Sequence, residues 1–279
     1  MTNLALTIPA DPMLDTTGLD KVLRVDPVVG PGTLLFIEPR LWPTAGVPAS
    51  TVPNQSGWAV DLLGAGARDL AVSNTIVNGL VERGSRGTLH VAHKRMAGTG
   101  AEFYALQNQA IRDYMAANPT HSYVEVVSMR PTRIPHGSWV PASSQRILGL
   151  TQTSADAMNL RVNSSREVVS GHPTSSTVRT FSQPLTISDD SAAAAGVAIA
   201  AFTNITGTVS SSPSLLVFHN GGVDSVGMSF KVYFAMIEDL TVSGRTPEQV
   251  AALVNAKHAA QLAVGGPYRG DIVTDPYTL

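Results

Sequence analysis

The chain has 279 residues, of which 43% are hydrophobic and only 14% are charged. This size allows one large β-domain or two smaller domains, and the hydrophobic content excludes a disordered chain. The formal net charge of −2 and the scattered basic residues argue against a nucleic-acid partner. A chain so poor in charge suits a β-sandwich, and also a protein that buries its surface against neighbouring subunits.

The sequence contains no cysteine, which excludes disulfides and thiolate sites. Its first residues do not form a secretory signal, because Pro9, Asp11 and Pro12 interrupt the apolar stretch. No apolar run approaches the ~20 residues that a membrane span needs. We therefore expect a protein that is made in a cytoplasm, stays there in solution and has no membrane partner.

Prolines are dense over residues 1–57, which argues against long helices and interior strands there. Only residues 33–37 have the pattern of a strand. We predict an extended N-terminal arm over residues 1–57 and one β-sandwich domain over 58–279. The arm could lie along its own domain, but apolar side chains such as Val28 and Trp42 need partners. We expect those partners in other subunits, with Trp42 as an assembly residue.

Beyond the arm, short apolar runs alternate with Gly, Pro, Ser and Asn, which is typical of a sandwich or jelly roll. The predicted fold class is all-β, a concanavalin-like β-sandwich or jelly roll. The expected strands cover residues 58–63, 88–93, 122–129, 146–150, 158–162, 197–202, 214–218 and 228–236.

Two helices are expected within this β-rich pattern. Apolar residues at helical spacing predict one internal helix over residues 101–117, which Asn118-Pro119 ends. A second, C-terminal helix begins at Thr246-Pro247-Glu248-Gln249, which has an N-cap, a proline in the first turn and a capping box. Gly265-Gly266-Pro267 stops it.

The sequence carries no complete catalytic signature. His90 and His93 form an H-x-x-H pair, but on a strand they point to opposite faces, and no third ligand is spaced nearby. Gly64-Ala65-Gly66 lacks the rest of a dinucleotide fingerprint and predicts a turn. A dispersed Ser-His-Asp triad stays open without local support. We predict a protein that is not an enzyme and that holds no metal or cofactor.

A polysaccharide-cleaving enzyme or a glycan-binding protein is the alternative. A glycosidase needs two converging carboxylates, yet Glu125 stands alone in its strand. Glu238 and Asp239 are adjacent and would face opposite ways. Tyr104, Tyr123 and Trp139 could stack on a sugar, although separated rings more often serve the core.

The segment from Glu238 to Thr246 is expected to fasten the C-terminal helix to the sheet. Leu240 and Val242 should anchor it, and Gly244 permits a turn that other residues adopt poorly. Arg245 should reach a carboxylate, which is Glu238, Asp239 or Asp271. The predicted assembly or structural residues are Trp42, Glu238, Asp239, Gly244, Arg245 and Thr246.

Residues 230–246 and 265–271 resemble the ends of phage virion proteins that contain a concanavalin-like, or laminin-G-like, jelly roll. In those proteins a closing strand leads through an E-D-L-T-x-S-G-R-T loop into a helix, and a G-G-x-x-x-G-D segment follows. Residues 123–133 look like an early strand of the same sandwich. The likeness is strongest over residues 225–279.

This resemblance implies a structural component of a bacteriophage particle, in a tail, fibre or capsid-decoration position. The implied partners are other virion proteins and copies of the chain itself, a trimer being one option. A host-surface glycan is a secondary partner, and the implied location is the virion. The resemblance carries no catalytic residue, metal or cofactor to this chain.

Overall fold

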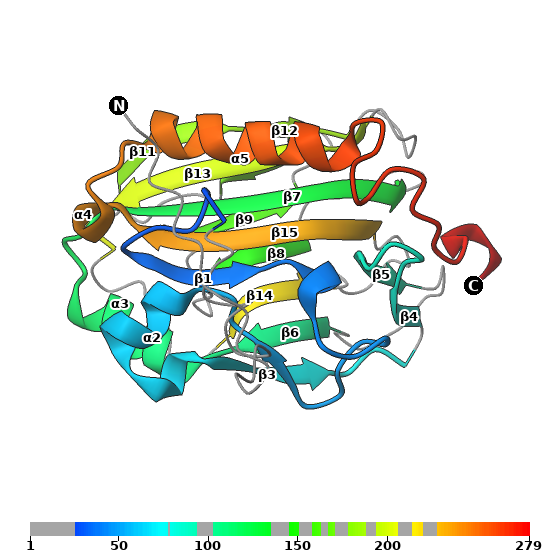
Figure 1. The fold of residues 1–279 in the computed structure, drawn as a ribbon, viewed down its shortest axis with the longest axis horizontal. Coiled ribbons are helices and arrows are strands. Elements are labelled where there is room, and N and C mark those ends of the chain that lie inside the picture. The colour runs from blue at the N-terminus through cyan, green and yellow to red at the C-terminus, as the bar shows by residue number, and fades with distance from the viewer. Residues whose placement is uncertain are drawn as a thin grey trace, which may run out of the picture.

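The computed structural model describes residues 26–77, 79–93, 103–134, 145–150, 158–162, 167–170, 178–187, 194–205, 214–219 and 228–279. These residues form two antiparallel sheets that pack face to face, with few helices around them (Figure 1). The predicted all-β sandwich is therefore confirmed.

The first sheet, here called sheet A, has seven strands in the order β11, β13, β7, β15, β5 and β4, with β1 also paired to β15. The central strand β15 pairs with β7 along one side and with β1 and β5 along the other. The bounds are β1 Thr33–Ile37, β4 Gly79–Arg83, β5 Leu89–His93, β7 Tyr123–Arg133, β11 Val178–Gln183, β13 Gly196–Thr203 and β15 Ser229–Asp239.

The second sheet, sheet B, has eight strands in the order β12, β10, β9, β8, β14, β6, β3 and β2. The bounds are β2 Thr51–Pro53, β3 Asp69–Asn74, β6 Phe103–Gln107, β8 Gln145–Leu150, β9 Met158–Val162, β10 Glu167–Ser170, β12 Leu185–Thr186 and β14 Ser214–His219. Side chains that point inward from both sheets, such as Val91, Leu106 and Phe230, form the main core.

Helix α5 (Pro247–Leu262) lies over the outer face of sheet A, across β13 and β7 (Figure 1). Its buried residues Val250 and Val254 pack with Val124 and Val126 of β7 in a second apolar cluster. Sheet A is therefore covered on both faces around its centre, which explains why every residue of β15 is buried. None of the described helices is long and apolar enough to cross a membrane.

The boundary predicted at residue 57 is wrong, because residues 26–57 belong to the sandwich. Strand β1 pairs with β15, and Val28 and Trp42 are 1% and 4% exposed within the cores of their own chain. The prolines of this segment are compatible with a paired β1 because they lie outside that strand, for example in the short edge strand β2. The rest of the expected arm, residues 1–25, lies outside the described residues.

Residues 58–63 form a helix, α2 (Gly57–Leu63), where a strand was predicted. The side chain of Ser56 caps this helix and accepts a hydrogen bond from the backbone N–H of Ala59 at 3.2 Å. A short, mostly apolar run has no periodicity that separates a strand from a helix. The capping residue was the signal that distinguished them.

The helix predicted over residues 101–117 is half right. Residues 103–107 form β6, which pairs with β14 and β3 in sheet B. The helix itself, α3 (Gln109–Ala117), begins after Asn108, whose side chain accepts a hydrogen bond from the N–H of Ile111 at 2.9 Å. With the short α4 (Leu240–Ser243), the described chain has three α-helices before α5, where one was expected.

Candidate functional site

A row of ionisable side chains crosses the outer face of sheet A beyond the end of helix α5. Glu82 on β4 stands opposite His90 on β5, His90 opposite Lys231 on β15, and Lys231 opposite Arg130 on β7. The sequence neighbours of His90 and Lys231 belong to the core between the sheets, so alternation along each strand points these side chains outward. We call these four residues the polar row.

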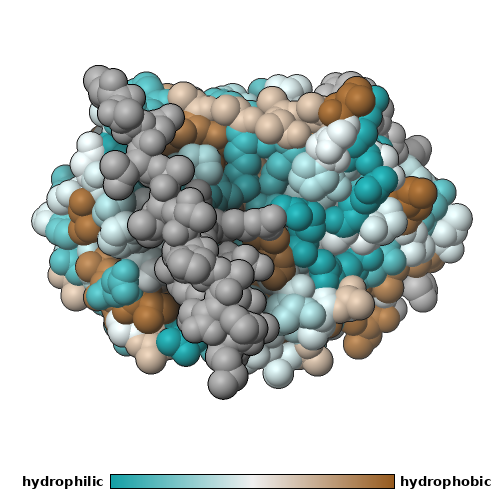
Figure 2. Space-filling view, viewed as in Figure 1, coloured by the Kyte–Doolittle hydropathy of each residue, from teal (hydrophilic) through white to brown (hydrophobic). Residues whose placement is uncertain are grey.

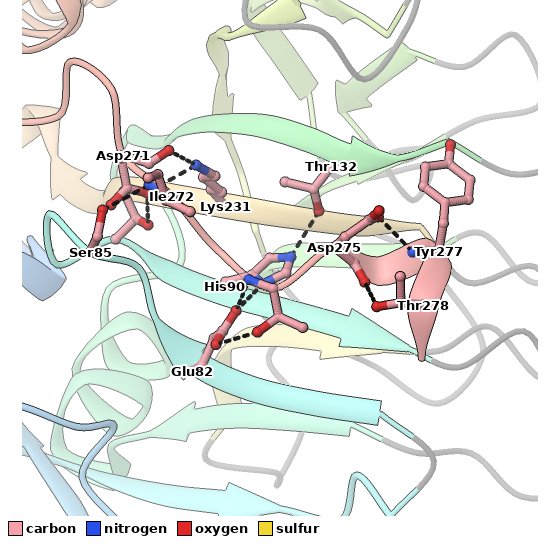
Figure 3. A network of polar contacts seen from close by, with 12 residues as sticks. Glu82, Ser85, His90, Thr132, Lys231, Asp271, Ile272, Asp275, Tyr277 and Thr278 are labelled. Carbon is pink, nitrogen blue, oxygen red and sulfur yellow. Dashed lines mark hydrogen bonds and ion pairs between the residues drawn. The ribbon is translucent and has the colours of Figure 1, made fainter.

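The C-terminal tail, residues 268–279, covers the polar row (Figure 3). Thr274 donates to both carboxylate oxygens of Glu82, through its backbone N–H at 2.7 Å and its hydroxyl at 2.9 Å. Arg133 on β7 donates to the carbonyl of Pro276 at 2.9 Å. The backbone N–H of Ile272 donates to the hydroxyl of Ser85 at 2.8 Å. The tail is thus bound to three neighbouring parts of the sheet.

His90 joins a carboxylate to a hydroxyl within this row. Its Nδ1 lies 2.9 Å from Oε1 of Glu82, and its Nε2 lies 2.9 Å from Oγ1 of Thr132 (Figure 3). Burial lowers the pKa of His90, although Glu82 opposes that effect. A neutral imidazole that donates its Nδ1–H to the Glu82 carboxylate accepts a hydrogen bond from the Thr132 hydroxyl at Nε2.

The charge of Glu82 is fixed by the same contacts. Burial raises the pKa of Glu82, but hydrogen bonds from His90 and from Thr274 outweigh it and leave the pKa below its ordinary value. A carboxylate, an imidazole and a hydroxyl in this order have the arrangement of an acid–base–nucleophile triad. The geometry alone therefore resembles the dispersed triad that the sequence left open.

The surroundings of this triad oppose a catalytic role. His90 is 0% exposed and Thr132 is 9% exposed, so a substrate has little access to either group. Both oxygens of Glu82 are also occupied by Thr274 of the tail. The hydrogen-bonding capacity of the triad is used to hold the chain's own C-terminal tail against the sheet.

Lys231 fastens the tail at a second point. Its Nζ lies 3.0 Å from Oδ2 of Asp271 and 2.7 Å from the Asp271 carbonyl, and both side chains are almost fully buried. The hydroxyl of Thr88 donates to the same carboxylate at 2.7 Å, and the backbone N–H of Arg86 donates at 2.5 Å. Burial lowers the pKa of Lys231, and Asp271 opposes that effect.

Gly84 permits this close approach. A Cβ at Gly84 would lie 2.5 Å from Oδ2 of Asp271 and 2.5 Å from Oγ1 of Thr88, where no atom fits. The turn between β4 and β5 is therefore shaped to receive a carboxylate, and the tail supplies it.

A second hydroxyl–imidazole pair lies under helix α5. The Ser128 hydroxyl on β7 lies 2.8 Å from Nδ1 of His258, whose ring packs edge-on against Tyr233 at 5.9 Å. Burial lowers the pKa of His258, so this imidazole is also neutral. Because Ser128 is fully buried, the pair joins the helix to the sheet and offers no accessible nucleophile.

The contact expected from Arg245 is present. Its Nη1 lies 3.4 Å from Oε2 of the buried Glu238 and donates to the carbonyl of Val28 at 2.7 Å. Gly244 has a φ of +69° and ends helix α4, which is the left-handed turn that the sequence predicted. Thr246 caps α5 and forms a complete capping box with Gln249. We call this group the Arg245 latch.

Asp239 points to the other side of the strand from Glu238. Its Oδ1 accepts the backbone N–H groups of Thr241 and Val242 at 2.9 and 3.2 Å and so caps helix α4. Its Oδ2 accepts from the Tyr114 hydroxyl at 2.8 Å and from His121 Nδ1 at 2.6 Å. Asp239 therefore connects helix α3, and the turn between α3 and β7, to the end of β15. Val242, an expected anchor, is 40% exposed, whereas Leu240 is buried.

The remaining sequence candidates do not form a binding surface. Tyr104 and Tyr123 are fully buried in the core, so neither ring is open to a sugar, and Trp139 lies outside the described residues. Trp42 is also buried in its own chain, which removes the reason for expecting a partner there. Among the described residues, no three His, Cys, Asp or Glu side chains are grouped as metal ligands.

No family model and no curated protein matches this sequence. Among solved structures, the chain is similar to the binding domain of botulinum neurotoxin DC, solved in complex with rat synaptotagmin II. The TM-score is 0.43 and the sequence identity is 10%. The alignment covers 81% of this chain and 51% of that one, so this chain spans about half of that structure's length. A likeness at this level carries no functional information, and the β-sandwich class rests on the two sheets themselves.

Proposed function

We propose that the protein is a structural component of a bacteriophage particle, which acts through contacts with other particle proteins and with copies of itself. The observation that carries this proposal is the use of its polar clusters. The triad of Glu82, His90 and Thr132, the Lys231–Asp271 pair and the Arg245 latch all hold chain segments onto sheet A. Groups used in this way stabilise a scaffold and leave no accessible catalytic centre among them.

Two features of the sequence support the same proposal. The resemblance to phage virion proteins covers residues 225–279, and this stretch supplies strand β15, the Arg245 latch, helix α5 and the tail that closes the polar row. The low charge content of 14% suits a chain that buries part of its surface in an assembly.

The alternative, a glycan-binding or polysaccharide-cleaving protein, has less support. Two of the three aromatic rings on which it depends, Tyr104 and Tyr123, are buried. Glu238 and Asp239 bind groups on opposite sides of β15 and so do not converge as a catalytic pair. No described feature favours this alternative over a structural role.

Density-gradient sedimentation of a lysate from phage-producing cells tests the proposal. A tagged form of the chain should band with intact particles and remain with them after a salt wash. The same tag on an unrelated protein is the control for adsorption. A chain that stays at the top of the gradient in every preparation would contradict a structural role in the particle.

A further inference from the structure

The last residues of the chain are attached to sheet A mainly through polar contacts. Ile272 and Tyr277 are 72% and 58% exposed, and Pro276 is buried. Residues 269–279 are all described, and none of them belongs to either apolar core cluster (Figure 2 shows this face of the molecule). The position of this segment therefore depends on hydrogen bonds and an ion pair more than on hydrophobic burial.

A glycine stands where this segment leaves the body of the protein. Tyr268 is 2% exposed, belongs to the second apolar cluster and packs its ring 5.2 Å from that of Tyr233. Gly270 follows with a φ of +73°, and no atom of the described chain lies within 4 Å of the place that a Cβ would take. Residues 271–279, here called the strap, can therefore move about Gly270 while Tyr268 and helix α5 stay in place.

Two of the groups at the strap take up protons at acidic pH. Thr274 of the strap donates two hydrogen bonds to Glu82, and His90 lies against the same carboxylate (Figure 3). Burial raises the pKa of Glu82, but hydrogen bonds from His90 and Thr274 outweigh it and leave the pKa below its ordinary 4.5. Burial lowers the pKa of His90 below its ordinary 6.5. Both groups therefore bind protons less readily under the strap than in water.

Release of the strap reverses both effects. It removes the Thr274 hydrogen bonds from Glu82 and admits water to His90, so each pKa returns toward its ordinary value. A group whose pKa is lowered in the closed form stabilises that form above the ordinary pKa, and this stabilisation is lost as the pH falls. The closed strap is thus most stable above pH 6.5. It loses stability below 6.5 through His90 and below 4.5 through Glu82.

We propose that residues 271–279 form an acid-sensitive strap, which covers the polar row at neutral pH and swings away from it as Glu82 and His90 take up protons. A protonated Glu82 loses the charge that strengthens both hydrogen bonds from Thr274. A charged His90 has no lone pair left to accept the hydrogen bond from Thr132. This inference goes beyond the proposed structural function and does not depend on it.

The other ionisable groups around the strap leave this direction unchanged. They are Arg83 on β4, Arg86 in the turn after it, Arg130 and Arg133 on β7, Lys231 and Tyr233 on β15, and Asp271 and Asp275 on the strap itself. Lysine, arginine and tyrosine side chains do not titrate at acidic pH. Lys231 opposes a charge on His90 and Asp271 favours one, but burial has the largest effect on the pKa of His90. The water that enters on opening therefore decides the direction.

Opening changes the charge of the uncovered surface. Lys231, which is 3% exposed under the strap, loses its partner Asp271. At acidic pH it stands beside a charged His90 and a neutral Glu82. The polar row, which is balanced in charge when it is covered, then becomes a positively charged surface.

A spin label reports on the strap directly, because the chain has no cysteine of its own. Ile272→Cys places the label at an exposed position on the strap, and Ala252→Cys places it, in a separate chain, at an exposed position on helix α5. The mobile component of the Ile272→Cys spectrum should increase several-fold as the pH is lowered from about 8 to about 4, and the change should reverse. The spectrum of the Ala252→Cys chain should stay the same over this range.

Glu82→Gln imitates the protonated carboxyl group and should make the label of the Ile272→Cys chain mobile already at neutral pH. Glu248→Gln removes an exposed carboxylate from α5 and should leave the pH response unchanged. Circular dichroism checks that each variant is folded, and the titration with Glu82 intact decides the question if Glu82→Gln does not fold. A strap label that becomes mobile only together with the Ala252→Cys label would overturn the proposal. So would a folded Glu82→Gln chain whose strap label is as immobile at neutral pH as with Glu82 intact.

Discussion

Glu125 lies on β7 with its side chain between the two sheets, opposite Ala200 of β13 and Ile237 of β15. Both carboxylate oxygens are buried, and neither has a hydrogen-bond partner among the described residues. No charged side chain within that part of the chain offsets the burial, which raises the pKa of Glu125 well above its ordinary 4.5. The folded protein therefore holds Glu125 in its protonated form.

Glu125 should make the free energy of unfolding decrease as the pH rises. A raised pKa in the folded state contributes stability below the ordinary pKa of 4.5, and this stability is lost as pH rises through the folded pKa. Glu125→Gln cannot ionise. The melting temperature of this variant, relative to that of the wild type, should therefore rise as the pH is raised from mildly acidic to mildly alkaline. Glu248→Gln, at an exposed position, is the control. Parallel curves for wild type and Glu125→Gln would contradict the prediction.

Asp271 is the residue on which the buried Lys231 depends. Asp271→Asn leaves the ammonium group without a counter-charge, and breaking one side of a buried ion pair costs about 3–5 kcal/mol. Asp275→Asn makes the same chemical change four residues later, at an exposed position, and should cost much less. The free energy of unfolding in denaturant measures both. Equal, small losses would show that the Lys231–Asp271 contact contributes little.

Among the site residues, only contacts between sequence neighbours could be predicted. Arg245 and Glu238 lie seven positions apart on a strand and the loop that follows it, so their meeting depends on local geometry. The Glu82–His90–Thr132 triad depends on how β4, β5, β15 and β7 align side by side. Nothing in one sequence gives that alignment, although the apolar neighbours of His90 do indicate which face it occupies.

At the scale of elements, long strands with β-branched and aromatic residues were predicted well, as β7 and β15 show. Several short strands were also predicted, among them β5, β8, β9 and β14, but others were missed. Strand β4 (Gly79–Arg83) and strand β11 (Val178–Gln183) mix polar and apolar residues over only a few positions. Their conformation depends on the partner strand, which overrides local preference. The apolar spacing over residues 103–107 is also compatible with a helix. The N-cap Asn108 is the signal that helix α3 begins only after these residues.

The Arg245 latch leads to a prediction about the start of helix α5. Thr246→Ala removes the N-cap and should cost about 1 kcal/mol. Arg245→Ala leaves the buried Glu238 without its cation and frees the Val28 carbonyl, so it should cost about 1–3 kcal/mol. Thermal or denaturant unfolding of both variants measures the difference. Arg269→Ala, which removes an exposed arginine, is the control, and an Arg245→Ala protein that unfolds like it would contradict the latch.

Segments from both ends of the described chain meet on the outer face of sheet A. Lys257 of α5 pairs with Glu38 at 2.8 Å and with Asp26, which lies 231 positions away in the sequence. The hydroxyl of Tyr268 donates to the carbonyl of Tyr233 on β15 at 3.1 Å. These contacts explain why residues 26–57 could not be an independent arm. Long-range contacts of this kind stabilise the fold, and local sequence patterns do not predict them.

The copy number of the chain in purified phage particles tests the proposed structural role. Quantitative mass spectrometry against isotope-labelled peptides should give a fixed, whole-number ratio to the main structural protein of the particle in independent preparations. A trace amount that varies between preparations, or disappears with further purification, would contradict a structural role.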